Sequence, residues 1–366
     1  MSDREHQRLD FLSRAGLADA VRIPLPGDAS TRRYERLKAA DGRSLILMDQ
    51  PPAEESAVAP EDADEATRQA LGYNAEARLA GGSVAAFVAI AGWLREQGLS
   101  TPIIGARDTA EGFAVLEDLG DDVFAAHQNG LETLYGTAVD ALAALHAATP
   151  PSVIAADGER WPLHRYDGLA YRSGLDPFLE WWPNFAGLPV PSDEARAEWQ
   201  ALWAPIIEMG ASADPVFVHR DYHAENLLWL PDRTGLARVG MLDFQDAVRG
   251  HPAWDLLHLL QDARRDVSPE LETAMLERYL EARGPGVDRQ AFLREYRALA
   301  ALNAARILGR VFARQEVLFR RDRYTAFMPR TWRHLERDLE IGELDGLKAW
   351  FDRHIPAEAR VAENRS

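Results

Sequence analysis

Three oxygen-bearing side chains, those of Asp221, Asn226 and Asp243, stand beside short apolar runs in the second half of this chain of 366 residues. Apolar runs precede Asp221 and Asp243 and follow Asn226, which is typical of short β-strands that hold a polar loop between them. Mg²⁺ prefers oxygen ligands and is often held by one or two carboxylates together with phosphate oxygens. The pattern predicts phosphoryl transfer, in which a further carboxylate accepts the proton of the attacking hydroxyl.

Other roles for these residues stay open at this point. Asp and Asn often satisfy backbone groups in turns, and either one alone would be interpreted in that way. The spaced pair together with Asp243 favours chemistry instead. His219 and His223 could hold a metal with Asp243 in a metal hydrolase, but their strand-like surroundings disfavour a helical His pair. We interpret His219 as a scaffold residue that hydrogen-bonds the loop, and not as a base.

The motif His219-Arg220-Asp221, with Asn226 five positions after the Asp, matches the H-R-D-x-x-x-x-N catalytic loop of protein kinases. Asp243-Phe244 stands where those kinases have D-F-G, with Gln245 in place of the Gly. The chain resembles the aminoglycoside phosphotransferase (small-molecule kinase) branch of the protein-kinase-like fold. Within that branch it looks most like the bacterial anomeric N-acetylmuramate/N-acetylglucosamine kinases. The segments that carry the resemblance are 27–34, 116–120, 217–226, 242–247 and 308–322.

The resemblance implies an α+β fold with two lobes. A small antiparallel-sheet N-lobe that binds nucleotide is expected at 1–118, with an acidic insertion at 50–82. A larger and mostly helical C-lobe, which carries the catalytic and substrate residues, is expected at 119–355, followed by a charged tail at 356–366. The Pro-, Ala- and acid-rich composition of the insertion predicts a mobile surface segment.

The resemblance also implies ATP and Mg²⁺ as cofactors. Asp221 is the expected catalytic base, and Asn226 and Asp243 are the expected metal ligands. Nucleotide-binding residues are expected in the turn after residue 26, beside it, and at the hinge: Asp28, Ala29, Ser30, Thr31, Arg33, Glu117 and Leu119. From its residues alone, the glycine-poor turn favours an ordinary hairpin over a phosphate cradle.

One departure from the kinase pattern concerns phosphate charge. Kinases place a lysine on the strand that here reads 45–48, and Met48 stands at that position. Some other cation must then neutralise the phosphates, and Arg32, Arg33 and Lys38 are the candidates. Because an arginine can clamp phosphate with two hydrogen bonds, we favour Arg33.

The expected activity is transfer of the ATP γ-phosphoryl group to a sugar hydroxyl, most simply the anomeric one of N-acetylmuramate or N-acetylglucosamine in cell-wall recycling. Asp246, Arg306 and Arg310 are candidate acceptor contacts. The arginine-rich stretch 306–330 suits a neutral or carboxylate-bearing sugar. An aminoglycoside or other small alcohol is an alternative acceptor, since acidic residues suit a polycation. A nucleotide-binding pseudokinase is the alternative of another class.

Composition narrows the range of partners. The formal net charge of −17 disfavours nucleic-acid and anionic-membrane binding, which need a basic surface. The chain has no cysteine, which excludes disulfides and thiolate chemistry. No apolar run is long enough to span a membrane and the start does not resemble a signal peptide, so we expect a cytoplasmic protein. We further expect a monomer or weak dimer.

Periodicity predicts the elements that position these residues. A short helix within 1–20 is expected to cover an edge of the sheet, and the Asp41-Gly42 turn is expected to join two strands of a five-stranded N-lobe. The aromatic stretch 161–191 is interpreted as core in preference to a sugar platform. Helices are expected at 83–97, 131–145, 269–283, 288–319 and 330–341.

Overall fold

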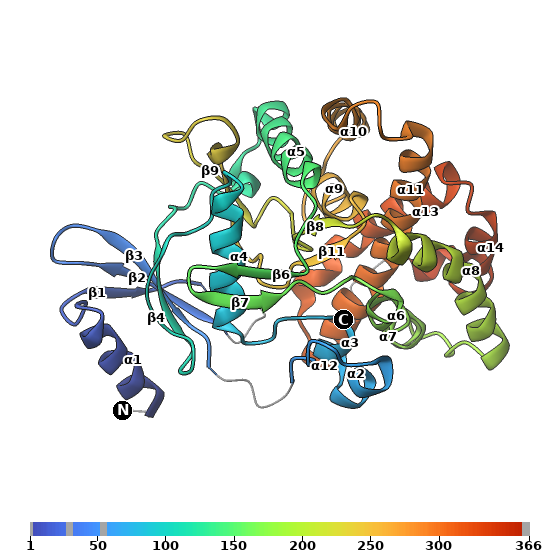
Figure 1. Ribbon diagram of the computed structural model, residues 1–366. Coiled ribbons are helices and arrows are strands. Elements are labelled where there is room, and N and C mark those ends of the chain that lie inside the picture. Colours follow the sequence, from blue (N-terminus) through green and yellow to red (C-terminus); the bar gives the residue numbers. More distant parts are fainter. Residues whose placement is uncertain (1–2, 27–31, 52–56, 361–366) are drawn as a thin grey trace. The chain divides into compact units, whose positions relative to one another are not determined.

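The computed structural model describes residues 3–26, 32–51 and 57–360, and these group into two compact units (Figure 1). The first unit comprises Met1–Ala141, Pro151–His164 and His219–Ala247. The second comprises Leu142–Pro150, Arg165–Val218 and Val248–Ser366. The segment with the kinase-like motifs therefore packs in the same unit as the N-terminal strands. The lobe boundary expected between residues 118 and 119 stays a prediction.

A five-stranded antiparallel sheet forms the centre of the first unit, as expected. Its order is β1-β2-β3-β5-β4, and β2 pairs with β3 from Arg33 opposite Asp49 to Lys38 opposite Ser44. Gly42 adopts φ +85° in the turn between them, which glycine permits at little steric cost. The strands are β1 (Val21–Pro24), β2 (Arg33–Lys38), β3 (Ser44–Asp49), β4 (Ile104–Asp108) and β5 (Phe113–Glu117).

Helix α1 (Asp3–Arg14) covers a face of this sheet, so the expectation that it would cover an edge is wrong. Phe11 and Leu12 are buried against apolar side chains that β2, β3 and β5 present to the same face. Each strand alternates its side chains, so these residues share one face and offer α1 a continuous apolar surface. They are Leu37, Leu47, Phe113 and Val115.

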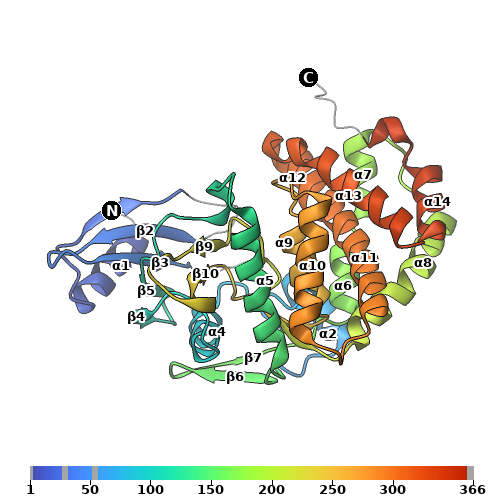
Figure 2. The ribbon, with the colours of Figure 1, turned by 90° about the horizontal axis from the view of Figure 1, so that it is seen from above.

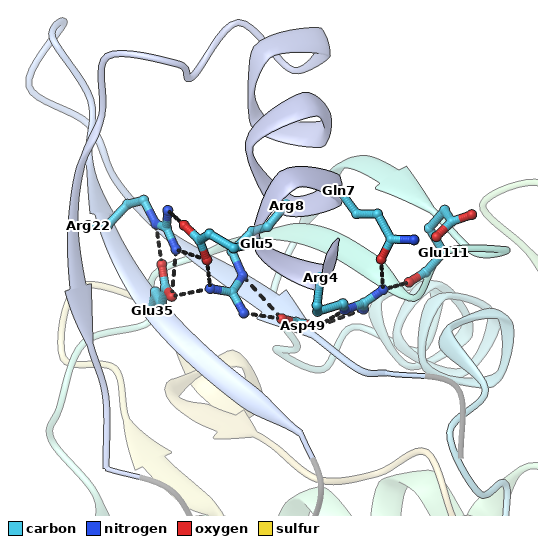
Figure 3. Close-up of polar contacts among 8 residues, drawn as sticks. All are labelled: Arg4, Glu5, Gln7, Arg8, Arg22, Glu35, Asp49 and Glu111. Atoms are coloured by element: carbon cyan, nitrogen blue, oxygen red, sulfur yellow. Dashed lines mark hydrogen bonds and ion pairs between the residues drawn. The ribbon is translucent and has the colours of Figure 1, made fainter. Parts of the chain in front are cut away.

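Ion pairs fasten α1 to the end of β3 (Figure 3). The Asp49 carboxylate is only 3% exposed, and it accepts hydrogen bonds from Arg4 (2.5 Å from Nη2) and Arg8 (2.5 Å from Nη2). Arg4 also donates to the backbone oxygen of Glu111 at 2.7 Å. A second set of ion pairs adjoins this one and involves Glu5, Arg22 and Glu35. The carboxylate at the end of β3 is therefore buried and fully paired.

Residues 57–82 of the acidic insertion are folded, and several of their side chains are buried; the expectation that the insertion is a mobile surface segment stays a prediction. It contains α2 (Glu65–Leu71), capped by Asp64, and the short α3 (Tyr73–Glu76). Arg68 is 2% exposed and donates to the backbone oxygens of residues 75 and 76. The alanines of this part are small enough to pack closely, and the buried guanidinium has its carbonyl partners, which composition alone does not reveal.

Helix α4 (Val84–Glu96) is the main helix of the first unit, as the sequence predicts. The Ser83 hydroxyl accepts from the Ala86 amide at 3.2 Å and caps its start. Residues 86–94 are all buried. The hairpin of β6 (Val153–Ala156) and β7 (Glu159–Pro162) packs on α4 and contributes to this burial.

A second hairpin in the first unit carries the kinase-like motifs. Strand β9 (Leu227–Trp229) pairs antiparallel with β10 (Val239–Met241), and the connection includes the 3₁₀ turn Gly235–Arg238. Another 3₁₀ turn, Phe124–Ala126, lies next to β9. Asn226 therefore directly precedes one strand, and Asp243 closely follows the other.

The second unit is mainly helical, and Figure 2 shows α9, α10 and α11 running side by side. A short pair, β8 (Val216–Val218) with β11 (Val248–Gly250), adds to it. The helices after α5 (Leu131–Ala147) are α6 (Gly168–Leu175), α7 (Phe178–Ala186), α8 (Asp193–Ser212), α9 (Ala253–Leu260), α10 (Pro269–Arg283), α11 (Arg289–Arg306), the π-helical Ile307–Ala313, α12 (Arg314–Phe319), α13 (Met328–Ile341) and α14 (Asp345–His354), with 3₁₀ turns at Asp322–Phe327 and Ala357–Ala359.

Aromatic residues form the core of the second unit. Phe178 stacks on Trp199 at 5.4 Å between ring centroids, and Trp182 meets Trp332 edge-on at 5.0 Å. Phe178, Trp182 and Trp199 are fully buried. The interpretation of 161–191 as core is therefore confirmed for Phe178 and Trp182. Among the described helices, none is both long and apolar enough to cross a membrane.

Candidate active site

The loop from His219 to Asn226 is held by its own hydrogen bonds. The backbone oxygen of Asp221 accepts from the His223 amide at 3.0 Å and from Asn226 Nδ2 at 3.0 Å. The backbone oxygen of Asn226 in turn accepts from the Leu242 amide at 2.9 Å, one residue before Asp243. The structure therefore brings together Asp221, Asn226 and Asp243, which are up to 22 positions apart in the chain.

His219 serves this loop as a scaffold. Its Nδ1 accepts a hydrogen bond from the Asp221 amide at 3.3 Å, and its ring is fully buried. Burial lowers the pKa of His219 to about 4, although the nearby Asp243 carboxylate acts in the opposite direction. The ring is consequently neutral at neutral pH and orients Asp221 without exchanging a proton.

Asp243 is held by an arginine from a distant part of the sequence. Arg32, the residue before β2, donates from Nη1 to Asp243 Oδ1 at 3.1 Å and to Gln245 Oε1 at 2.9 Å. Gln245 Nε2 donates to the same Oδ1 at 3.0 Å. The Asp243 side chain nevertheless stays 44% exposed. One carboxylate oxygen is thus occupied by two donors, and the group as a whole remains accessible.

The place of the absent kinase lysine is a small cavity of about 10 Å³ in the first unit. Met48 lines it together with Arg32, Gln50 and Gln245, beside the residues that begin α4. Arg32 therefore supplies a cation where the strand itself has a methionine. Sequence reasoning favoured Arg33, which is exposed on β2.

Asp246 contacts a backbone amide of the first unit. Its Oδ1 accepts from the Ala80 amide at 2.6 Å, and Arg220 Nη1 lies 3.5 Å from its backbone oxygen. Arg220 also donates to the backbone oxygen of Ala77 at 2.9 Å. Part of the Asp246 carboxylate is thus committed to the residues before α4.

The expected hinge residues lie at the end of β5. Glu117 accepts from Arg233 at 2.6 Å and from the Ile103 amide at 3.1 Å, so its side chain is engaged within the unit. Leu119 packs beside Gly240, where an added Cβ would lie 3.4 Å from Leu119 Cδ1. Between them, burial acts to raise the pKa of Asp118, but hydrogen bonds from Ser44 and Arg36 outweigh burial and hold that pKa below its usual value.

The remaining expected residues lie elsewhere. Arg306 is in the second unit, where it donates to Asn303 Oδ1 at 3.1 Å and packs against Gly174. Arg310 is in the π-helical segment of that unit, and such segments are frequent at functional sites. The four expected turn residues Asp28, Ala29, Ser30 and Thr31 lie outside the residues that the structure describes.

The donor set around Asp243 fits Mg²⁺ better than zinc. The amide nitrogen of Asn226 donates to the backbone oxygen of Asp221, so its amide oxygen can serve as a metal ligand. Asp243 adds a carboxylate. Within the described ranges, no group of three or more His, Asp or Glu residues is placed to hold a metal ion. His219, His223 and Asp243 therefore do not form the site that a metal hydrolase would need.

Sequence reasoning missed the contacts from residues 57–82 to the motif loops. Ala77 and Ala80 belong to no motif, and both of these contacts use their backbone atoms. Arg68, which bonds the backbone just before Ala77, belongs to no motif either. A local signal exists only for the following helix, in the Ser83 cap after two glycines. Sequence alone could therefore place the start of α4 and not the partners of the residues before it.

The chain has relatives among known proteins. Residues 21–293 match the model of the phosphotransferase enzyme family. The chain is 55% identical to the N-acetylmuramate/N-acetylglucosamine kinase of Caulobacter vibrioides, over 98% of this chain and 99% of that protein.

Solved structures support the fold. The choline kinase LicA of Streptococcus pneumoniae aligns with a TM-score of 0.53 at 14% identity, covering 94% of this chain and 99% of that one. The ADP-bound aminoglycoside phosphotransferase APH(2'')-Ib aligns with a TM-score of 0.52 at 12% identity, covering 94% and 99%. At such identities the likeness concerns the protein-kinase-like α+β fold alone. The interpretation as a pseudokinase is set aside, because the chain belongs to the phosphotransferase enzyme family and is an enzyme that transfers phosphate to a hydroxyl group.

Proposed function

We propose that this enzyme transfers the γ-phosphoryl group of ATP to the anomeric hydroxyl of N-acetylmuramate or N-acetylglucosamine. The observation that carries the proposal is the 55% identity, over 98% of the chain, to a kinase named for these two sugars. The reaction would return cell-wall sugars to metabolism. It would occur in the cytoplasm, where ATP is available, in a monomer or weak dimer.

Asp221 acts as the base in this proposal. Its carboxylate accepts the proton of the sugar hydroxyl while the hydroxyl oxygen forms a bond to the γ-phosphorus. The bond from the γ-phosphorus to the oxygen that bridges the β- and γ-phosphates breaks, and ADP leaves. A positioned base contributes about 10²–10⁴-fold. The bonds from His223 and Asn226 to the Asp221 backbone support this role, since they hold the residue in place.

The nucleotide is held by the residues around Asp243 and by the hinge. Asn226 and Asp243 would hold Mg²⁺, which neutralises phosphate charge when bound. Arg32 supplies protein charge beside them, with Arg33 as the exposed neighbour on β2. The backbone at Glu117 and Leu119 would bind adenine, and the turn Asp28–Thr31 the phosphates.

The acceptor would be held by arginines of the second unit. Arg306 and Arg310 are the candidates, and Arg310 lies in the π-helical segment Ile307–Ala313, a kind of segment that is frequent at functional sites. A guanidinium suits the carboxylate of N-acetylmuramate, which it can bind with two parallel hydrogen bonds. Asp246 already accepts a hydrogen bond from the Ala80 amide with Oδ1, so only the rest of its carboxylate can bind the sugar.

The test is ATP consumption with a panel of acceptors: N-acetylmuramate, N-acetylglucosamine, glucose, kanamycin and choline. We expect turnover with the two N-acetyl sugars, and a product whose phosphate is on C1 by phosphorus NMR. Arg310→Ala should raise KM for N-acetylmuramate more than for N-acetylglucosamine, which lacks the carboxylate. Turnover with kanamycin alone would instead identify an antibiotic kinase.

A further inference from the structure

We propose that residues 64–82, here called the α2–α3 strap, position the catalytic loop by holding Arg220 and Asp246. The inference rests on the proposed function, because it assigns Asp221 and Asp243 their roles. The strap and both motif loops belong to the same compact unit, so the contacts between them lie within that unit. Arg220 and Asp246 are then positioning residues.

Hydrogen bonds within the strap hold its two helices together. Asp64 accepts from the Thr67 amide at 2.8 Å and caps α2. The Arg68 guanidinium, buried from solvent, donates to the backbone oxygens of Ala75 at 3.1 Å and Glu76 at 2.5 Å. A buried charge that loses its partners is costly, so these bonds fix the end of α3 relative to α2. They also fix the direction in which the next carbonyl, that of Ala77, points.

Two backbone groups of the strap then meet the motif loops. The Ala77 oxygen accepts from Arg220 Nη1 at 2.9 Å, and the Ala80 amide donates to Asp246 Oδ1 at 2.6 Å. Both alanines are 1% exposed. The Ala77 carbonyl thus pairs with the guanidinium of Arg220, and the Ala80 amide pairs with the carboxylate of Asp246. Such charge-assisted bonds are stronger than neutral ones.

The residues so held flank the proposed chemistry. Arg220 directly precedes Asp221 and has φ +78°, while Asp246 follows Asp243, which has φ +60°. Non-glycine residues are strained in this left-handed region and persist there when their surroundings hold them. The Ala77 carbonyl gives Arg220 such a constraint. Loss of the strap should let Asp221 move, and a misplacement of about 1 Å can cost about 10²-fold in rate.

Arg68→Ala tests the strap without touching either loop. We expect kcat to fall about tenfold or more, KM for ATP to change less than about twofold, and amide hydrogen exchange at 219–226 to become faster. Arg14→Ala is the matched control, since it removes an arginine whose side chain is 64% exposed and pairs with Asp108. It should leave kcat and exchange at wild-type values.

A double-mutant cycle separates positioning from general loss of structure. Since Arg68 acts in part through Arg220, Arg68→Ala combined with Arg220→Ala should lower kcat by less than the product of the two single effects. Effects that multiply would overturn the proposal, as would wild-type kcat and exchange in folded Arg68→Ala. Should Arg68→Ala not fold, Asp246→Ala removes the acceptor of the Ala80 amide instead. Wild-type kcat in Asp246→Ala would then refute the strap.

The exchange measurement needs no acceptor. If no N-acetyl sugar is phosphorylated, the proposed function fails, and faster exchange at 219–226 in Arg68→Ala still supports the strap. Unchanged exchange would overturn the strap even in an enzyme that phosphorylates N-acetylmuramate.

Discussion

Nη1 of Arg32 lies 3.1 Å from Oδ1 of Asp243, although the two residues are 211 positions apart in the chain. Arg32 is the residue before β2, and β3 carries Met48 at the position where kinases have a lysine. A side chain from the start of the chain therefore supports the carboxylate that follows β10. Arg32 and Met48 line the same small cavity, so we propose Arg32 as the cation that takes the place of a lysine on β3.

Arg32→Ala should weaken nucleotide binding. A hydrogen bond to a charged group contributes about 1.5–3 kcal/mol, so KM for ATP should rise about 10- to 100-fold. Arg43→Ala removes an arginine that is 64% exposed and pairs with Asp41, and it serves as the control with unchanged KM. An unchanged KM in Arg32→Ala, with a raised one in Arg33→Ala, would return the role to Arg33.

Asp221→Asn should lose turnover and keep ATP binding. The amide cannot accept the hydroxyl proton, so kcat should fall by about 10²–10⁴-fold. The Asp221 contacts that hold the loop use backbone atoms, which this substitution keeps. Full activity of Asp221→Asn, measured by ADP release, would end its assignment as the base.

Asp243→Ala should abolish nucleotide binding that depends on Mg²⁺. The substitution removes the carboxylate ligand and leaves Arg32 without this partner, so added Mg²⁺ should no longer increase affinity. Titration calorimetry with ATP, with and without Mg²⁺, measures the difference. Equal enhancement by Mg²⁺ in wild type and variant would show that the metal is held elsewhere.

Asp49→Ala should destabilise the protein. The carboxylate is 3% exposed and pairs with both Arg4 and Arg8, and removal of one partner of a buried pair costs about 3–5 kcal/mol. Urea unfolding gives the free energy of unfolding. Asp41→Ala, whose side chain is 52% exposed, should change it by less than about 1 kcal/mol. Equal effects of the two substitutions would contradict the importance of this ion pair.

Stability should fall as pH decreases below neutrality. Burial lowers the pKa of His219 to about 4, below its ordinary value of about 6.5, so the unfolded chain binds the extra proton first. Its contribution is therefore fully present above pH of about 6.5 and is lost as pH falls toward 4. Urea unfolding at pH 7.5 and 5 should show a smaller loss in His219→Gln than in wild type. An equal loss in both would exclude His219 as a source.

The sequence by itself determined the class of fold and identified the motif residues that we propose for the chemistry. The motif could be recognised because the spacing of Asp221, Asn226 and Asp243 follows from a local hairpin. The residues that form a local hairpin are close together in the sequence. Strand alternation and helical periodicity likewise predicted the five-stranded sheet and α4, since both periods follow from backbone geometry.

Only the tertiary structure decided which distant groups meet. The pairing of Arg32 with Asp243 joins residues far apart in the chain, and so does the bond from Arg220 to the backbone oxygen of Ala77. The burial of Arg68 in an acidic, alanine-rich segment has the same origin. Backbone carbonyls and amides are the same in every residue, so no motif marks the ones that become partners. Their selection comes from packing, which brings together residues that local sequence cannot relate.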